Sequence, residues 1–93
     1  MPVERSVQQF RVPSHVLSRS VGDDTVLLDL HRDEYFSLDS VGTQVWCLLV
    51  EGESVKSIVD RITETYGVDV AVVADDVDAL ISDLVATGLL VTA

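Results

Sequence analysis

Residues 34–49 read EYFSLDSVGTQVWCLL, and within this stretch a strand pattern changes to a helix pattern with almost no loop between them. Residues 34–38 alternate between two faces, with Phe36 and Leu38 on the same one. The apolar positions that follow have helical spacing, at Val41, Val45, Leu48 and Leu49. A strand that runs straight into a helix is left at a sheet edge beside the helix layer, an arrangement suited to holding an extended peptide.

Two more strands are predicted before this stretch. The first is His15–Val21, and the glycine and two aspartates after it supply turn chemistry. The second is Thr25–Leu30. One face of this second strand carries Val26, Leu28 and Leu30. The sequence therefore predicts a three-stranded antiparallel meander whose third strand, at residues 34–38, lies at an edge.

Capping residues bound the predicted helices. Asp39 or Ser40 can cap the first helix, which is expected to end near Gly52. Ser54 caps a second helix, and Gly67 is well placed as its left-handed stop. The apolar stripe of the second helix is predicted at Val55, Ile58, Val59, Ile62 and Tyr66.

A third helix is predicted between the cap Asp69 and the stop Gly88, after which residues 89–91 are expected to return to the core. Its inward positions are predicted at Val73, Val77, Leu80, Ile81 and Leu84. Three strands followed by three helices predict an α+β fold of the winged helix-turn-helix type. Residues 10–93 are expected to form one domain, and residues 1–9, which show no periodicity, a flexible N-terminal arm.

The chain is strongly acidic, with 16 acidic residues against 6 basic ones and a net charge of −10. Lys56 and Arg61 are the only cations near the second and third helices, and Arg61 is the last basic residue of the chain. A winged-helix protein that reads DNA needs cations for phosphates and donors for base edges. Nucleic-acid binding is therefore the disfavoured alternative, and anionic membrane surfaces are disfavoured as partners for the same reason.

Residues for catalysis or metal binding are scattered along the chain. His15 and His31 belong to different segments, and no spacing typical of metal ligands links them to Cys47. The aspartates within residues 75–78 point to different faces of a helix, so they cannot surround one cation. We therefore expect no enzymatic activity, no metal and no cofactor.

The expected compartment is the cytoplasm. The N-terminus has no apolar signal core, and no apolar run reaches the length needed to span a bilayer. The single cysteine, Cys47, cannot form an internal disulfide, which is consistent with a reducing environment. Within a helix it is expected to act as a small buried apolar residue.

Short motifs spread over residues 10–91 combine into a specific pattern. They are Thr25–Leu30, Tyr35–Asp39, Val41–Gly42, Val45–Trp46, Ile58–Val59, Tyr66–Val68, Asp76–Val77 and Gly88–Leu90. This combination resembles the PqqD family, whose members include the RiPP recognition elements. These are small winged-helix-like domains that bind the leader peptides of ribosomally made, modified natural products.

The resemblance implies a mode of peptide binding. In the family, the leader adds as an antiparallel strand to the third strand, and its side chains enter a groove between that strand and the third helix. Carried over to this sequence, the implied peptide-binding residues are Glu34, Tyr35, Phe36, Ser37 and Leu38 on the strand and Val72, Asp76, Ala79, Leu80 and Asp83 on the helix.

Individual roles within this set stay open. Tyr35 and Phe36 are the expected anchors of the peptide, and Tyr35 is the one expected to face it. Phe36, Leu38 and Leu80 can equally be core residues. The charge of Asp76 favours a basic or hydrogen-bond-donating residue in the leader, or the carboxylate is merely solvated.

The resemblance also implies the kind of pathway. Free-standing domains of this size deliver the precursor to a separate leader peptidase in lasso-peptide biosynthesis. Others present it to a radical-SAM enzyme in the pyrroloquinoline quinone pathway and related pathways. We favour the lasso pathway on overall similarity, including residues 10–13 and the Tyr35-Phe36 pair. In both cases the protein is an adaptor whose partners are a leader peptide and a leader peptidase or other modifying enzyme.

Overall fold

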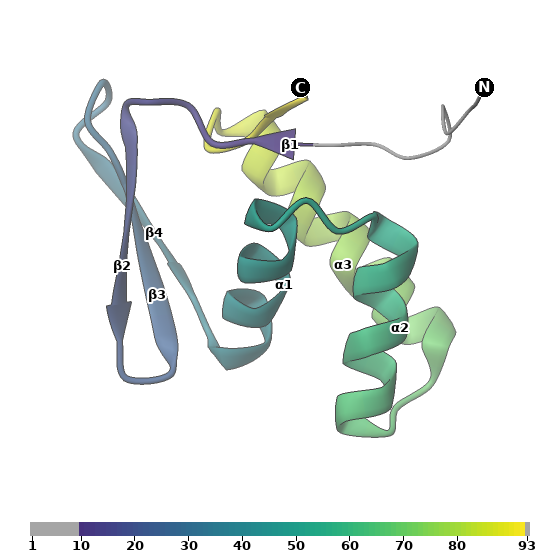
Figure 1. Ribbon diagram of the computed structural model, residues 1–93. Coiled ribbons are helices and arrows are strands. Elements are labelled where there is room, and N and C mark those ends of the chain that lie inside the picture. Colours follow the sequence, from purple (N-terminus) through teal and green to yellow (C-terminus); the bar gives the residue numbers. More distant parts are fainter. Residues whose placement is uncertain (1–9, 93) are drawn as a thin grey trace.

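The structure, a computed structural model, describes residues 10–92 and has a three-stranded antiparallel sheet beside a group of helices (Figure 1). The strands are β2 (Val16–Val21), β3 (Asp24–Asp29) and β4 (Glu34–Leu38), in the order β2-β3-β4. The predicted meander is thus confirmed, and within the described chain β4 is an edge strand. The predicted arm at residues 1–9 lies outside the described residues.

The face of the sheet that packs against the helices is set by β3. Leu27 and Asp29 are buried, whereas Val26 and Leu28 are only half-buried. Leu30 follows the end of β3 and is exposed. Val26, Leu28 and Leu30 therefore share the outer face of the sheet, because Leu27 occupies the inner face against α1.

The three predicted helices follow the sheet. They are α1 (Ser40–Val50), α2 (Val55–Tyr66) and α3 (Val70–Ala86). Of the described helices, none has both the length and the apolar character needed to cross a membrane. Three strands and then three helices confirm the α+β fold class.

The caps predicted from sequence hold the helix ends. Asp39, not Ser40, is the N-cap of α1, because its Oδ1 accepts the backbone N–H of Gly42 at 2.8 Å. Ser54 and Asp69 cap α2 and α3 through their side-chain oxygens. Gly67 ends α2 with a φ of 64°, a conformation that a side chain disfavours.

The core lies between the sheet and the helices, and most predicted inward positions are buried. Three expectations were wrong. Val41, in the first turn of α1, is 38% exposed, because its neighbour Gly42 is the residue that packs against Leu38. Tyr66, in the last turn of α2, is 41% exposed, because it lies at the end of its helix, where the turn into α3 covers it only in part. Cys47 is exposed, because its neighbour Trp46 occupies the buried side of α1. The buried apolar residues are Val16, Leu27, Leu38, Val45, Trp46, Leu49, Ile58, Val59, Ile62, Val73, Val77, Ile81, Leu84, Leu89 and Leu90.

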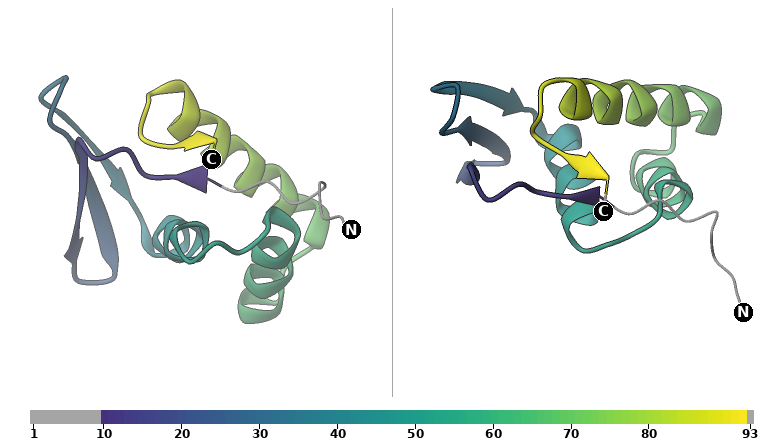
Figure 2. Two further views of the ribbon diagram at one scale, coloured as in Figure 1. Left: turned by 45° about the horizontal axis from the view of Figure 1, so that its top comes forward. Right: turned by 90° about the horizontal axis from the view of Figure 1, so that it is seen from above.

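A second, two-stranded sheet joins the two ends of the described chain. β1 (Phe10–Arg11) pairs antiparallel with β5 (Val91–Thr92), and Figure 2 shows the two short strands side by side. The expected return of residues 89–91 to the core is confirmed, since Leu89 and Leu90 are buried. The pairing itself was not predicted.

Candidate functional site

A groove opens beyond the end of β4, between the first turns of α1, the end of α2 and one flank of α3. We call it the helix groove; its volume is about 620 Å³. Its lining residues are Asp39, Val41, Gly42, Val45, Ile62, Tyr66, Val68, Val72, Val73, Asp76, Val77, Ala79, Leu80 and Asp83.

Most of the helix groove is apolar. Its rim includes Val41, Tyr66, Val68 and Val72, each exposed by 38% or more. The Tyr66 hydroxyl accepts a hydrogen bond from the side-chain amide of Gln44 at 3.1 Å, which ties the end of α2 to α1. Exposed apolar side chains that are held around a hollow are suited to binding an apolar group of a ligand.

The polar residues of the helix groove are chiefly carboxylates. Asp39, Asp76 and Asp83 line it, and among the described residues no lysine, arginine or histidine does so. One oxygen of Asp39 is occupied by the cap of α1. Asp76 and Asp83 are exposed and form no ion pair with any described residue. The groove is therefore negative as well as apolar.

A smaller cleft separates β4 from the C-terminal end of α3. We call it the strand cleft; its volume is about 50 Å³. It is lined by Asp29, Glu34, Tyr35, Phe36, Thr87 and Leu89. Leu80 and Asp83 in the helix groove and Thr87 in the strand cleft follow at helical spacing, so both hollows lie along one flank of α3.

The side chains of β4 alternate in exposure. Tyr35 is 74% exposed on the outer face, next to Leu28 of β3. Phe36 is half-buried and packs against the core, and Leu38 is 3% exposed. Apart from its pairing with β3, this strand has a free edge within the described structure. Its backbone groups on that edge are available to another strand.

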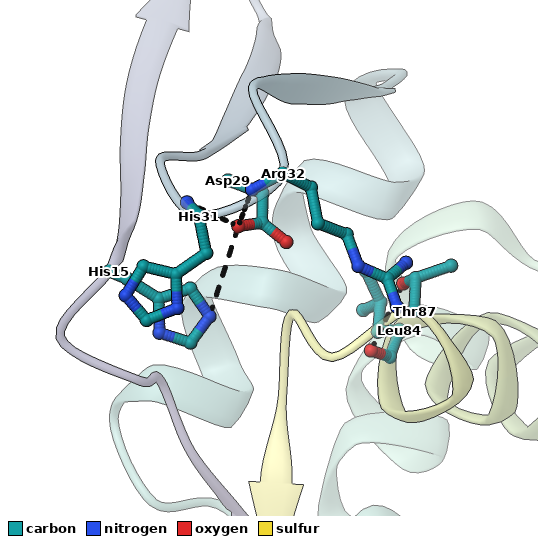
Figure 3. A network of polar contacts seen from close by, with 6 residues as sticks. All are labelled: His15, Asp29, His31, Arg32, Leu84 and Thr87. Carbon is teal, nitrogen blue, oxygen red and sulfur yellow. Dashed lines mark hydrogen bonds and ion pairs between the residues drawn. The ribbon is translucent and has the colours of Figure 1, made fainter.

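Asp29 organises the turn that leads into β4 (Figure 3). Its Oδ1 accepts the backbone N–H groups of His31 at 3.0 Å and Arg32 at 3.1 Å. The backbone N–H of Asp33, which has a φ of 59°, donates to the carbonyl oxygen of Asp29 at 2.8 Å. These contacts compensate a buried carboxylate and fix where β4 begins.

The charge state of Asp29 reflects opposing effects. Burial raises the pKa of its carboxyl, but the two backbone hydrogen bonds and the charges of His15 and Arg32 outweigh it. The pKa of Asp29 is therefore lowered from its ordinary value of 3.8. The carboxylate is ionised at neutral pH, as its role as an acceptor requires.

His15 and His31 lie together at this end of the sheet. Their rings stack with centroids 3.9 Å apart and planes 7° apart, and His15 Nε2 lies 3.9 Å from Asp29 Oδ1. Figure 3 shows the Arg32 side chain extending toward Thr87 at the C-terminal end of α3, where a positive charge is favourable. Within residues 10–92, no cluster of three or more His, Cys, Asp or Glu side chains could hold a metal ion.

The other free edge of the main sheet, at β2, borders a different cleft. Its volume is about 430 Å³. Its lining differs from that of the helix groove in containing an arginine and several hydroxyl side chains; the residues are Val12, Ser18, Arg19, Ser20, Thr25, Trp46, Cys47, Val50 and Glu51.

Known proteins resemble the chain in sequence and in structure. The family model described as coenzyme PQQ synthesis protein D (PqqD) matches residues 24–90. The chain belongs to the PqqD family. No curated protein sequence matches it.

Two solved structures share this PqqD fold. TbiB1 in complex with the TbiA(beta) leader peptide is 38% identical, with a TM-score of 0.80, and the match covers 86% of this chain and 93% of TbiB1. Lasso peptide synthetase B1 complexed with the leader peptide is 24% identical, with a TM-score of 0.84 over 89% of this chain and 98% of that protein. The second likeness concerns the fold.

The ten residues implied by the PqqD resemblance fall into three groups. The five helix residues, Val72, Asp76, Ala79, Leu80 and Asp83, line the helix groove. On the strand, Glu34, Tyr35 and Phe36 line the strand cleft. Ser37 and Leu38 line neither hollow. Leu38 has its side chain in the core, so only its backbone faces the free edge of β4.

Sequence reasoning missed part of the groove. Val41, Tyr66 and Val68 line it but were absent from the predicted site. Val41 and Tyr66 were interpreted as inward members of helical stripes, because periodicity alone does not tell where a partner helix ends. Val68 directly follows the left-handed Gly67, a position where an exposed apolar residue commonly packs back onto the helix end.

Proposed function

We propose that this protein binds the leader region of a ribosomally synthesised precursor peptide and delivers it to the leader peptidase of a lasso-peptide pathway. The observation that carries this proposal is an apolar groove that opens beyond the C-terminal end of β4, a strand whose outer edge is free within the described structure. It is supported by TbiB1, which is 38% identical over most of both chains and was solved with a leader peptide.

The leader adds antiparallel to β4 in this proposal. Main-chain hydrogen bonds to the free edge of β4 provide affinity that depends little on the leader sequence. Contacts with the flank of α3 provide sequence specificity. Tyr35 lies on the outer face of the sheet, which is the face that every second residue of the added strand also shares. The helix groove and the strand cleft receive side chains on the other face.

The protein acts as an adaptor and not as an enzyme. Its two histidines stack on each other beside a carboxylate that already accepts two backbone N–H groups. A bound leader instead raises the local concentration of the precursor at the partner enzyme. This mechanism needs one site for the leader and one for the enzyme, but no reacting group.

The family model itself favours a second candidate pathway. Its description as a coenzyme PQQ synthesis protein fits a domain that presents its peptide to a radical-SAM enzyme. Nucleic-acid binding gains no such support, because α3 carries exposed carboxylates where a DNA reader needs donors and cations.

Titration of a fluorescein-labelled leader tests the proposal. The first probe is the leader of the precursor gene nearest to this protein's own gene, and the second is the TbiA(beta) leader. Saturable binding that is lost on backbone N-methylation of alternate residues in one short segment is expected, because those N–H groups pair with β4. N-methylation outside the segment is the matched control. If no leader binds, the proposal is wrong.

Reconstitution separates the two pathways. With a labelled precursor and the candidate leader peptidase, adding this protein is expected to accelerate cleavage, and the protein alone is expected to cleave nothing. Acceleration of a radical-SAM modification instead would assign the protein to the second pathway.

A further inference from the structure

The helix groove and the strand cleft together form a track along one flank of α3, and this track is longer than β4. Val72, in the first turn of α3, and Thr87, the C-cap of that helix, are 15 residues apart, a rise of about 22 Å at 1.5 Å per residue. An extended peptide covers that distance with about seven residues, whereas β4 has five. A bound peptide that follows the track therefore projects past the strand into the helix groove.

Chain direction decides which part of the peptide projects. β4 begins at Glu34, which lines the strand cleft, and runs toward Asp39, which lines the helix groove. An antiparallel peptide runs the opposite way. The residues before its paired segment, on the N-terminal side, therefore lie in the helix groove.

We propose that the helix groove selects a leader with an apolar side chain next to a lysine or arginine, just before the segment that pairs with β4. This inference rests on the proposed function and names the residues that set its specificity. The apolar side chain packs between Tyr66, Val68 and Val72, which are all exposed at the groove rim. The cation lies at Asp76 or Asp83.

The positions of Asp76 and Asp83 allow them to discriminate between leaders of different charge. Asp76 and Asp83 are seven residues apart, so they lie on one side of α3, and neither is paired with a described cation. A leader carboxylate in the groove would meet the like charges of Asp39, Asp76 and Asp83 and no described cation. The hydrogen bond from Gln44 orients the Tyr66 side chain at the rim of the groove.

Separating local from overall charge is the main experimental difficulty, because a protein with a net charge of −10 attracts any cationic peptide. α3 offers a matched control. Asp75 and Asp78 are exposed on the same helix but do not line the groove. Asp76→Asn and Asp78→Asn change the net charge equally, and at a Debye length of about 8 Å the far side of a helix is largely screened.

The test is a scan of the labelled leader used above, with lysine, glutamine or glutamate at each position before the paired segment. One position is expected at which lysine binds more tightly than glutamine, and glutamine more tightly than glutamate. Asp76→Asn or Asp83→Asn is expected to reduce that preference about two- to fivefold, as for an exposed ion pair, whereas Asp78→Asn leaves it unchanged.

Charge reversal gives the sharpest outcome. Asp76→Lys combined with Asp83→Lys is expected to bind the glutamate peptide better than the lysine peptide, which loss of folding does not produce. Equal binding of all three peptides by the wild type, or equal effects of Asp76→Asn and Asp78→Asn, would overturn the inference while leaving leader binding intact. Absence of any leader binding would instead overturn the proposed function.

Discussion

At the scale of single residues, Tyr35 is the clearest candidate for a contact that has no structural role. Its side chain is 74% exposed, so Tyr35→Ala removes contact area for the leader and little from the core. Because tyrosines at interfaces often contribute more than 1 kcal/mol, we expect the Kd for the labelled leader to rise about fivefold or more. Thermal unfolding should be unchanged. Val21→Ala, at a 57% exposed position on the opposite edge strand β2, is the control; equal effects of the two would remove Tyr35 from the site.

Asp29 gives a pH dependence at the same scale. Its pKa is lowered in the folded protein, so the unfolded chain binds the proton more readily. The stabilising effect of the ionised carboxylate is therefore present at neutral pH and is lost as the pH falls through the folded pKa, below about pH 4. Asp29→Asn should lower the unfolding free energy at pH 7 and flatten its decline in acid.

Urea unfolding at a series of pH values measures this effect. Asp33→Asn is the matched control, because Asp33 is exposed in the same turn and asparagine tolerates its positive φ. The unfolding free energy of the control should fall in acid as steeply as that of the wild type. If the unfolding free energy of Asp29→Asn falls just as steeply, the turn is not the source of the pH dependence.

At the scale of elements, α3 has two sides with different tasks. Leu84 is fully buried, and Leu84→Ala should lower the unfolding free energy by about 2 to 5 kcal/mol through the cavity that it leaves. Val85→Ala, at a position that is 41% exposed on the same helix, should change it little. Denaturant unfolding measures both. A small loss for Leu84→Ala would mean that the site collapses around the missing side chain.

The elements themselves were predictable because their signals are local. Asp39, Ser54 and Asp69 cap their helices within two or three residues of the N–H groups that they accept. Contacts between distant segments were not predictable. No local pattern indicates that β1 pairs with β5, or that the carboxylate of Asp29 is buried under a turn that it organises itself.

The candidate site follows the same division. Its α3 flank could be named from the family resemblance together with helical spacing, and those residues line one groove. The wall of the groove opposite α3 could not be predicted, because Tyr66 reaches it only through the way α2 packs against α1 and α3. Its exposure depends on how far each helix extends past its neighbour, which is a property of the assembled fold.

At the scale of the whole molecule, salt should move two properties in opposite directions. A chain with a net charge of −10 repels itself, so raising the salt concentration should raise the urea midpoint of unfolding. The same screening weakens the attraction between the helix groove and a basic leader, so the Kd should rise. Both are measured at about 0.05 M and about 0.5 M NaCl, between which the screening length falls severalfold.

The two responses have different sources, and a charge variant separates them. Asp78→Asn removes one repelling charge outside the groove and should reduce the salt response of stability alone. Asp76→Asn removes a groove charge and should reduce both responses. If the wild type binds its leader more tightly as salt rises, apolar contacts dominate the groove. The leader would then be selected by the shape of the space beside Tyr66 and Val72, with the carboxylates as mere solvated groups.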